Sequence, residues 1–276
     1  MLSPEQRALQ LHIRLALGVG DTFDAQAELT RRVDFLAELL RSTGARVLVL
    51  GISGGVDSLT AGCLSQCAVR QVRAAGGDAR FVAMRLPYGT QLDEADAQAC
   101  LQVIQPDELL TVDVKPAADA MLASVQAAGQ VFRDAAQQDF IHGNIKARER
   151  MVAQYAVAGA WGGLVVGTDH AAESLMGFFT KFGDGAADAT PLAGLNKRRV
   201  RAIAALLGAP DSLVHKVPTA DLELLRPLKP DEDAFGVSYT QIDDFLEGKE
   251  VSSEIFDVIV STWRRSAHKR ALPIAP

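Results

Sequence analysis

Hydrophobic positions along this chain form short β-branched runs that alternate with longer segments of helical periodicity. We predict strands at 46–52, 80–86, 109–114 and 163–168, with a weaker one near Val214. Several runs are apolar at successive positions, which is typical of strands covered by helices on both faces. The pattern therefore predicts an α/β fold with a doubly wound, mainly parallel sheet.

Two helical segments are expected before the first strand. In the second, Leu29, Val33, Leu36 and Leu40 form one apolar stripe, and Gly44 supplies a stop signal. This stripe suits either the core of the protein or a dimer interface.

The segment 178–197 is rich in glycine and small residues and separates two helical patterns. We expect a long loop there, and long loops in compact domains are usually functional or disordered. The chain has no internal repeat and no linker rich in proline, glycine and serine. We therefore predict a single domain over residues 1–276.

Composition narrows the class of partner. The net charge of −6 argues against a broad basic surface for nucleic acid and favours a small charged metabolite. The cysteines, Cys63, Cys67 and Cys100, lack C-x-x-C spacing, so a reduced cytoplasmic location is expected. The amino terminus does not resemble a signal peptide, and no apolar run approaches the roughly 20 residues of a membrane span.

The most informative motif is the sequence GISGGVDS at 51–58, between a predicted strand and a predicted helix. Backbone N–H groups at such a turn favour an anion, and Gly54 and Gly55 allow phosphate oxygens to approach closely. Ser53 and Ser58 add hydroxyl donors. The turn lacks the lysine of a G-x-x-x-x-G-K-[ST] loop and carries Asp57 instead. A carboxylate beside polyphosphate implies a divalent cation between them, and we expect Mg²⁺.

A second group of polar residues follows the fourth predicted strand. Thr168, Asp169 and His170 should lie at the same edge of the sheet as the glycine-rich turn. Glu173 can supply a second carboxylate to the metal. We interpret His170 as a hydrogen-bonded structural residue and leave it out of catalysis.

The pattern S-G-G-x-D-S resembles the pyrophosphate-binding loop of the ATP pyrophosphatase superfamily. Between Glu28 and Arg270 the chain is similar, more specifically, to ammonia-dependent NAD synthetases. The similarity is carried by LGISGGVDS (50–58), RLPYGTQLDEADAQ (85–98), GNIKARERMVAQY (143–155), GTDHAAESLMGFFTKFGDGAAD (167–188), PLAGLNKRRVR (191–201), PTADLE (218–223), IDDFLEGKEV (242–251) and HKR (268–270). The resemblance implies a Rossmann-like fold of the adenine nucleotide alpha hydrolase type.

The family resemblance also implies a reaction. Members convert deamido-NAD (nicotinic acid adenine dinucleotide) into NAD with ATP and ammonia, the last step of NAD biosynthesis. The carboxylate attacks the α-phosphorus of ATP, pyrophosphate leaves, and ammonia converts the acyl adenylate into the amide. Pyrophosphate is thus what the turn must hold. No chain length is left for a glutaminase domain, so free ammonia is the expected nitrogen donor.

The resemblance further assigns individual residues. It implies a homodimer with its dinucleotide site at the interface, near Phe132 and the helix 134–160. Asp184 in FGDG is our hypothesis for the proton acceptor in the ammonia step. Positions matched to ATP binding are Gly51, Ile52, Ser53, Gly54, Gly55, Val56, Asp57, Ser58, Arg85, Gln91, Thr168, Lys197 and Thr219; those matched to deamido-NAD are Arg148, Lys181, Asp188, His268 and Lys269; those matched to Mg²⁺ are Asp57 and Glu173.

One position departs from the family pattern. Val56 stands where members often carry glutamine, which removes a polar group near the phosphates. Two alternatives remain open at this point: another adenylating enzyme of the ATP pyrophosphatase type, such as a GMP synthetase-like amidase or a transfer-RNA modifying enzyme, and a module that binds ATP without turnover.

Overall fold

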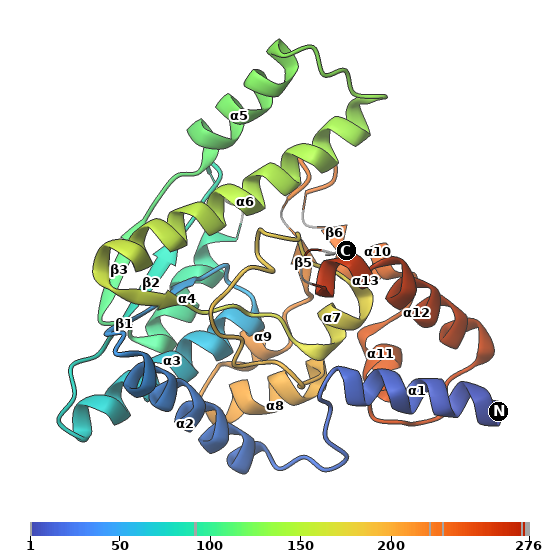
Figure 1. Ribbon diagram of the computed structural model, residues 1–276, viewed down its shortest axis with the longest axis horizontal. Helices are drawn as coiled ribbons and strands as arrows, with labels where there is room; N and C mark the ends of the chain where they lie inside the picture. The colour runs from blue at the N-terminus through green and yellow to red at the C-terminus, as the bar shows by residue number, and fades with distance from the viewer. Residues whose placement is uncertain (1, 91–92, 221, 228, 272, 274–276) are drawn as a thin grey trace.

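The computed structural model describes residues 2–90, 93–220, 222–227, 229–271 and 273. Its main sheet has four parallel strands in the order β3-β2-β1-β4 (Figure 1). These strands are β1 Val47–Gly51, β2 Arg80–Arg85, β3 Glu108–Thr111 and β4 Gly163–Val165. The predicted α/β class with a parallel sheet is confirmed.

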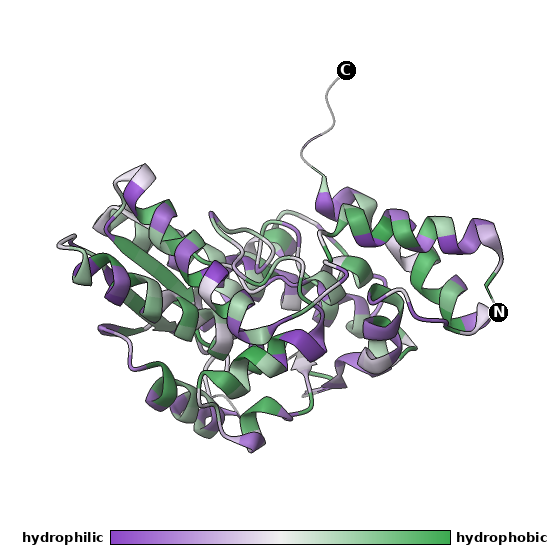
Figure 2. Ribbon diagram, turned by 90° about the horizontal axis from the view of Figure 1, so that it is seen from below, coloured by the Kyte–Doolittle hydropathy of each residue, from purple (hydrophilic) through white to green (hydrophobic). Residues whose placement is uncertain are grey.

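Helices cover both faces of this sheet, and Figure 2 shows hydrophobic strands between them. Leu48 and Leu50 of β1 pack in one apolar cluster with helices α2, α3 and α8, whereas Val47 and Val49 pack in another with α6. The helices are α1 Pro4–Ala16, α2 Ala25–Thr43, α3 Val56–Ala74, α4 Glu94–Ile104, α5 Lys115–Ala127, α6 Ala135–Trp161, α7 Ala171–Met176, α8 Lys197–Leu206, α9 Asp211–Val214, α10 Asp231–Phe235, α11 Tyr239–Leu246, α12 Ser253–Arg265 and α13 Ala267–Arg270.

Both helices expected before the first strand are present. Asp24 caps α2 by accepting a hydrogen bond from the N–H of Ala27, and Gly44 ends the helix with a φ of 72°. The side chains of Val33, Leu36 and Leu40 are buried in the core. The stripe on α2 therefore belongs to the core of this chain.

A further apolar cluster lies to one side of the sheet, where α1, α7, α11 and α12 pack together (right in Figure 1). Each of these four helices contributes at least one fully buried residue, for example Ile13, Leu175, Ile242 and Ile259. None of the helices in the described ranges is both long and apolar enough to cross a membrane. The assignment of the whole chain to one domain stays a prediction.

The weak strand near Val214 was a wrong prediction, because Val214 ends the short helix α9 and packs in the interior. Strand β4 is also shorter than the predicted 163–168. Beyond it, Val166 forms only an isolated bridge with Ala189. The residues between α7 and α8 form the long loop that was expected at 178–197.

The topology determines where a ligand can bind. The chain runs outward from β1 through β2 to β3 and then returns to place β4 on the other side of β1. Open parallel sheets bind ligands at such a reversal, beyond the carboxyl ends of the strands. The glycine-rich turn follows β1 and the TDHAAE segment follows β4, so both lie at this point. A small antiparallel pair, β5 Thr219–Ala220 and β6 Lys229–Pro230, brings the PTADLE segment to the same side.

Candidate active site

A cavity of about 420 Å³ opens at the carboxyl ends of β1 and β4. It gathers most of the residues assigned from the sequence, although they come from distant parts of the chain. Predicted site residues that line it are Gly51, Ile52, Ser53, Gly55, Val56, Asp57, Ser58, Arg85, Thr168, Glu173, Asp184, Lys197, Thr219 and Lys269. Gln91 lies outside the described residues.

The glycine-rich turn is held open by its own hydroxyl groups. The N–H of Ser53 donates to Ser58 Oγ (3.2 Å), and the two hydroxyl oxygens lie 3.1 Å apart. Gly55 is the N-cap of α3 but provides no side-chain cap, so the first N–H groups of this 19-residue helix are available to an anion. Gly54 has a φ of 90°, in the region that favours glycine.

Two neighbours explain why the turn is fixed in place. The N–H of Gly51 donates to Gln154 Oε1 of α6 (2.8 Å). Beneath the turn, buried Arg85 donates to the carbonyl oxygen of Ile52 and, at 2.7 Å, to Glu94 Oε2. Arg85 thus supports the turn as well as lining the cavity.

The departure at Val56 has a packing explanation. Val56 is only 4% exposed and packs against Ala204 of α8 and Val214 of α9. An apolar side chain here fills the space between the start of α3 and these helices. Its methyl groups also form part of the cavity wall.

Asp57, Glu173 and Lys197 meet at the centre of the site. Lys197 Nζ donates to Asp57 Oδ2 at 2.6 Å, and the lysine side chain is 1% exposed. Burial opposes the charged forms, but Lys197 and His170 lower the pKa of Asp57, and Asp57 with Glu173 raises that of Lys197. Burial, followed by repulsion from Asp57, raises the pKa of Glu173 well above its ordinary value.

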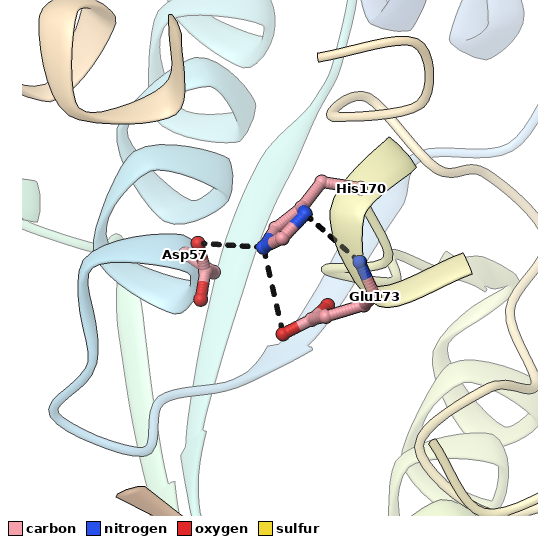
Figure 3. Close-up of side chains that lie close together, drawn as sticks. All are labelled: Asp57, His170 and Glu173. Atoms are coloured by element: carbon pink, nitrogen blue, oxygen red, sulfur yellow. Dashed lines mark hydrogen bonds and ion pairs between the residues drawn. The ribbon is translucent and has the colours of Figure 1, made fainter. Parts of the chain in front are cut away.

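His170 occupies the space between the two carboxylates, as Figure 3 shows. Its Nδ1 accepts a hydrogen bond from the N–H of Glu173 (3.4 Å), capping α7. Burial lowers its pKa to about 3, so the ring is neutral. The Nε2 atom of His170 lies 3.5 Å from both Asp57 Oδ1 and Glu173 Oε1, and 3.4 Å from Lys197 Nζ. The ring therefore contacts both carboxylates and the lysine at the centre of the site.

The donor atoms at this point suit a hard divalent cation. Ligand atoms of Asp57, His170 and Glu173 lie within 4.8 Å of one another. Asp57 Oδ1 is buried and has no hydrogen-bond donor within the described part of the chain. Carboxylate oxygens, rather than ring nitrogens, are the ligands that Mg²⁺ prefers. Asp57 and Glu173 fit the expected metal site.

Asp184 lies at the mouth of the cavity on the long loop. Its Oδ1 accepts a hydrogen bond from the N–H of Thr180 (3.0 Å). Although the residue as a whole is exposed, protein atoms packed around its carboxyl raise the pKa. Burial also raises the pKa of nearby Asp169 to about 7, with Asp184 adding to the shift. Both groups are more basic than ordinary aspartates.

The residues assigned to deamido-NAD are only partly in the cavity. Arg148 of α6 donates to the carbonyl oxygen of Lys181 (3.2 Å), and Lys181 Nζ donates to that of His268 (2.5 Å). Lys269 lines the cavity and donates to Gly177 and Phe179 carbonyl oxygens. These contacts bring α6, the long loop and the carboxyl-terminal segment together.

Asp188, the remaining residue of that set, is exposed and does not line the cavity. Its Oδ2 accepts a hydrogen bond from the N–H of Val165 (2.8 Å) at the end of β4. Within this chain, Asp188 therefore anchors the long loop to the sheet.

Comparison with known proteins decides the family. The family model described as NAD synthase matches residues 28–273. The chain belongs to the NAD synthase family. An NH3-dependent NAD(+) synthetase from Streptomyces coelicolor is 65% identical over 276 residues, covering 100% of both chains.

Solved structures of similar proteins agree with the fold. A crystal structure of NAD+ synthetase from Burkholderia pseudomallei has a TM-score of 0.86 at 60% identity, covering 99% of this chain and 100% of that one. An NMN synthetase from Francisella tularensis has a TM-score of 0.80 at 36% identity, covering 92% and 99%. The sheet and its flanking helices are therefore those of NAD synthetase structures.

Sequence reasoning missed several polar residues of this NAD synthase family site. Lys216 lines the cavity next to the glycine-rich turn, and Gln154 accepts a hydrogen bond from the N–H of Gly51 in that turn. Tyr239 lies beneath Lys197, whose Nζ is 4.9 Å from the ring centroid, and hydrogen-bonds to Asp231. Lys216 and Asp231 lie outside the stretches that carry the family resemblance, and Gln154 lies within one of them, GNIKARERMVAQY, at a position to which no role was assigned. Only the tertiary fold identifies these three residues.

Proposed function

We infer that the cavity at the carboxyl ends of β1 and β4 is where this NAD synthase family member acts as an NH3-dependent NAD+ synthetase, a ligase of NAD biosynthesis that uses ATP. The observation that carries the assignment is the meeting of the glycine-rich turn with Asp57, Glu173 and Lys197 in one cavity. A turn of backbone donors beside two carboxylates and a buried lysine suits a metal-bound triphosphate.

The proposed reaction has two steps. A carboxylate oxygen of deamido-NAD forms a bond to the α-phosphorus of ATP, and the bond to pyrophosphate breaks. Ammonia then forms a bond to the activated carbonyl carbon, AMP leaves, and the surplus proton passes to a base. The product is NAD, with AMP and pyrophosphate as co-products.

In this proposal the ATP phosphates lie over the glycine-rich turn, where N–H groups of α3 and the hydroxyl of Ser53 donate to them. Lys197 adds a positive charge beside Asp57. The remaining positions assigned to ATP, each reaching the cavity from a different segment, are Arg85, Thr168 and Thr219; the assignment of Gln91 stays a prediction.

Magnesium is part of the proposal. Asp57 and Glu173 would hold the ion, which would supply charge neutralisation at the phosphates. His170 lies between the two carboxylates, with its Nε2 3.5 Å from each.

Asp184 is the proposed proton acceptor for the ammonia step, because it lines the cavity and the pKa of its carboxyl is raised. Asp184→Asn should retain pyrophosphate release and lose amide formation by about 100-fold, in line with removal of a general base. If the variant formed the amide at the wild-type rate, Asp184 would not be the proton acceptor.

The dinucleotide site is proposed to lie at a homodimer interface. Along α6, the residues Ile141, Arg148, Val152 and Ala156 follow helical spacing and are exposed in the single chain. Figure 1 shows α5 and the amino-terminal part of α6 projecting together beyond the sheet. A partner covering this face would bury its apolar residues.

Such a partner would also place Arg148 next to the second subunit. With Lys181, Asp188, His268 and Lys269, Arg148 forms the group proposed to bind deamido-NAD, whose pyrophosphate and carboxylate suit cationic side chains. Phe132, half-buried at the turn between α5 and α6, is the other residue expected near the partner.

A cytoplasmic location is also proposed, because all three cysteines are free thiols. Burial raises the pKa of Cys63 and Cys100 to about 12, which keeps these two unreactive.

The decisive experiment is an assay of the purified protein with deamido-NAD, ATP, Mg²⁺ and ammonium, in which NAD, AMP and pyrophosphate are measured. Equal amounts of the three products are expected. A parallel assay with nicotinic acid mononucleotide tests the shorter acceptor, whose amide is NMN, since a relative of 36% identity is an NMN synthetase. Folded protein that makes no NAD would refute the proposal, and ATP binding without turnover would favour a non-catalytic module.

A further inference from the structure

Lys216 joins three segments at the rim of the cavity. It follows α9 and precedes β5, yet its Nζ lies 3.3 Å from the carbonyl oxygen of Gly54 in the glycine-rich turn. The same Nζ is 2.7 Å from Asp96 Oδ2 and 3.5 Å from Asp93 Oδ2, at the start of α4. One ammonium group therefore links the turn, the amino end of α4 and the segment that leads to Thr219.

The turn depends on the position of α4. Gly54 packs so closely on the first turn of α4 that a β-carbon there would lie 2.9 Å from the backbone nitrogen of Ala97. Asp93 is the N-cap residue of α4, and Asp96 is in its first turn. By contacting both carboxylates and the carbonyl of Gly54, Lys216 fixes the two surfaces against each other.

The positive charge of Lys216 also offsets the negative charge of the neighbouring carboxylates. Asp93 lines the cavity, and its buried Oδ1 has no hydrogen-bond partner among the described residues. Two carboxylates at the rim would repel a triphosphate. Lys216 pairs with both carboxylates, lines the same cavity and keeps 22% of its side chain exposed.

We propose that Lys216 is a further binding residue for the outer phosphates of ATP, the pair that leaves as pyrophosphate. It supplies from outside the turn the positive charge that a G-x-x-x-x-G-K-[ST] loop carries within it. The ammonium of Lys197 donates to Asp57, whereas the ammonium of Lys216 donates to the carbonyl oxygen of Gly54 in the glycine-rich turn. This assignment rests on the proposed function, because it requires ATP in this cavity.

The test is equilibrium binding without turnover, by titration calorimetry of the full chain with Mg²⁺ and each of ATP, pyrophosphate and AMP. Lys216→Met should weaken binding of ATP and pyrophosphate at least tenfold and leave binding of AMP within twofold, because AMP lacks the outer phosphates. Lys216→Arg, which keeps the charge, should recover at least half of the loss on a logarithmic scale. Melting temperatures confirm that each variant is folded.

Lys249→Met is the matched control, since Lys249 also pairs with two carboxylates, Asp244 and Glu247, but lies outside the cavity. It should change none of the three affinities. Equal weakening of AMP and ATP by Lys216→Met would reduce Lys216 to a structural residue and overturn the inference, as would unchanged pyrophosphate binding or an arginine variant as weak as methionine. NAD formation by the wild type tests the proposed function separately.

Discussion

At the residue scale, the two carboxyl groups at the centre of the cavity differ in how readily they ionise. Lys197 favours the ionised form of Asp57, whereas Glu173, next to the same Asp57, is pushed toward its protonated form. Such an imbalance is what an added divalent cation would relieve, because it attracts both carboxylates at once.

The first prediction concerns the metal. Glu173→Gln keeps the size of the side chain but removes one ligand charge, so the Mg²⁺ concentration for half-maximal activity should rise at least tenfold. Calorimetry with Mg²⁺ alone should show the same loss of affinity. In metal-free buffer at pH 8 the melting temperature of the variant should not fall below that of the wild type, because the repulsion between Asp57 and the carboxylate of Glu173 is removed.

Glu254→Gln, on the exposed side of α12, is the control and should leave the Mg²⁺ dependence unchanged. A Glu173→Gln variant with wild-type Mg²⁺ affinity would rule Glu173 out as a ligand.

The second prediction is a pH dependence of stability that arises from Asp169. Its pKa is about 7 in the folded protein and about 3.9 in an unfolded chain. The folded state thus keeps a proton that the unfolded state has lost. The contribution of this group to stability is complete below about pH 4 and is lost as the pH rises through 7.

Asp169→Asn removes that dependence. In metal-free buffer, the melting temperature of the variant should exceed that of the wild type by a margin that grows by about 2 °C or more between pH 5.5 and 8.5. Exposed Asp257 of α12 provides the control substitution, Asp257→Asn. A margin that stays constant with pH would contradict the elevated pKa.

Some residues of the site could be predicted from the sequence and others could not. Asp57 and Glu173 could be placed because each sits in a motif at the end of a strand, and parallel strands end at one edge. Lys216 and the packing of Val56 depend on α4, α8 and α9 meeting α3, which no local pattern encodes. His170 was recognised as a hydrogen-bonded residue, but its place between the two carboxylates was not foreseen.

At the scale of elements, the buried strands were predictable because their apolar runs are continuous. β1 and β2 are both covered by helices and lie within one residue of their predicted ends. The strand predicted near Val214 was wrong because a short buried helix and a short buried strand show the same apolar pattern in the sequence. The glycine-rich stretch between α7 and α8 was correctly read as a loop.

The third prediction tests how the glycine-rich turn packs on α4. Gly54→Ala places a β-carbon against the backbone of Ala97 at a φ of 90°, which should cost about 1–3 kcal/mol of local strain. The turn must shift to relieve it, so the KM for ATP should rise at least tenfold and the melting temperature should fall by several degrees.

Gly208→Ala is the matched control. Gly208 also has a positive φ, 83°, but its would-be β-carbon has no close neighbour within 4 Å among the described residues, and it is not among the residues that line the cavity. The control should lower the melting temperature while leaving the KM for ATP unchanged. If both variants affected the KM equally, close packing on α4 would not be the reason that the turn needs glycine.

At the scale of the whole molecule, the single chain leaves apolar side chains on α6 uncovered next to Arg148. Val152 is 52% exposed, and Ile141, about three helical turns earlier along the same face, is 37% exposed. The sequence could not reveal this face by itself, because helix α6 both packs on the sheet and lines the cavity. Its exposed stripe becomes visible only when those contacts are known.

The fourth prediction follows from the proposed dimer. Sedimentation of the wild type should give twice the mass of one chain, and Val152→Asp should shift the equilibrium toward monomer, since it would bury a charge against the partner. Because Arg148 lies on the same face, the KM for deamido-NAD should rise with the monomer fraction, while ATP binding should change little. Leu11→Asp, at a comparably exposed leucine of α1 (48%), should leave mass and activity unchanged. A wild-type protein that is fully active as a monomer would remove the partner subunit from the dinucleotide site and leave α6 with a different role.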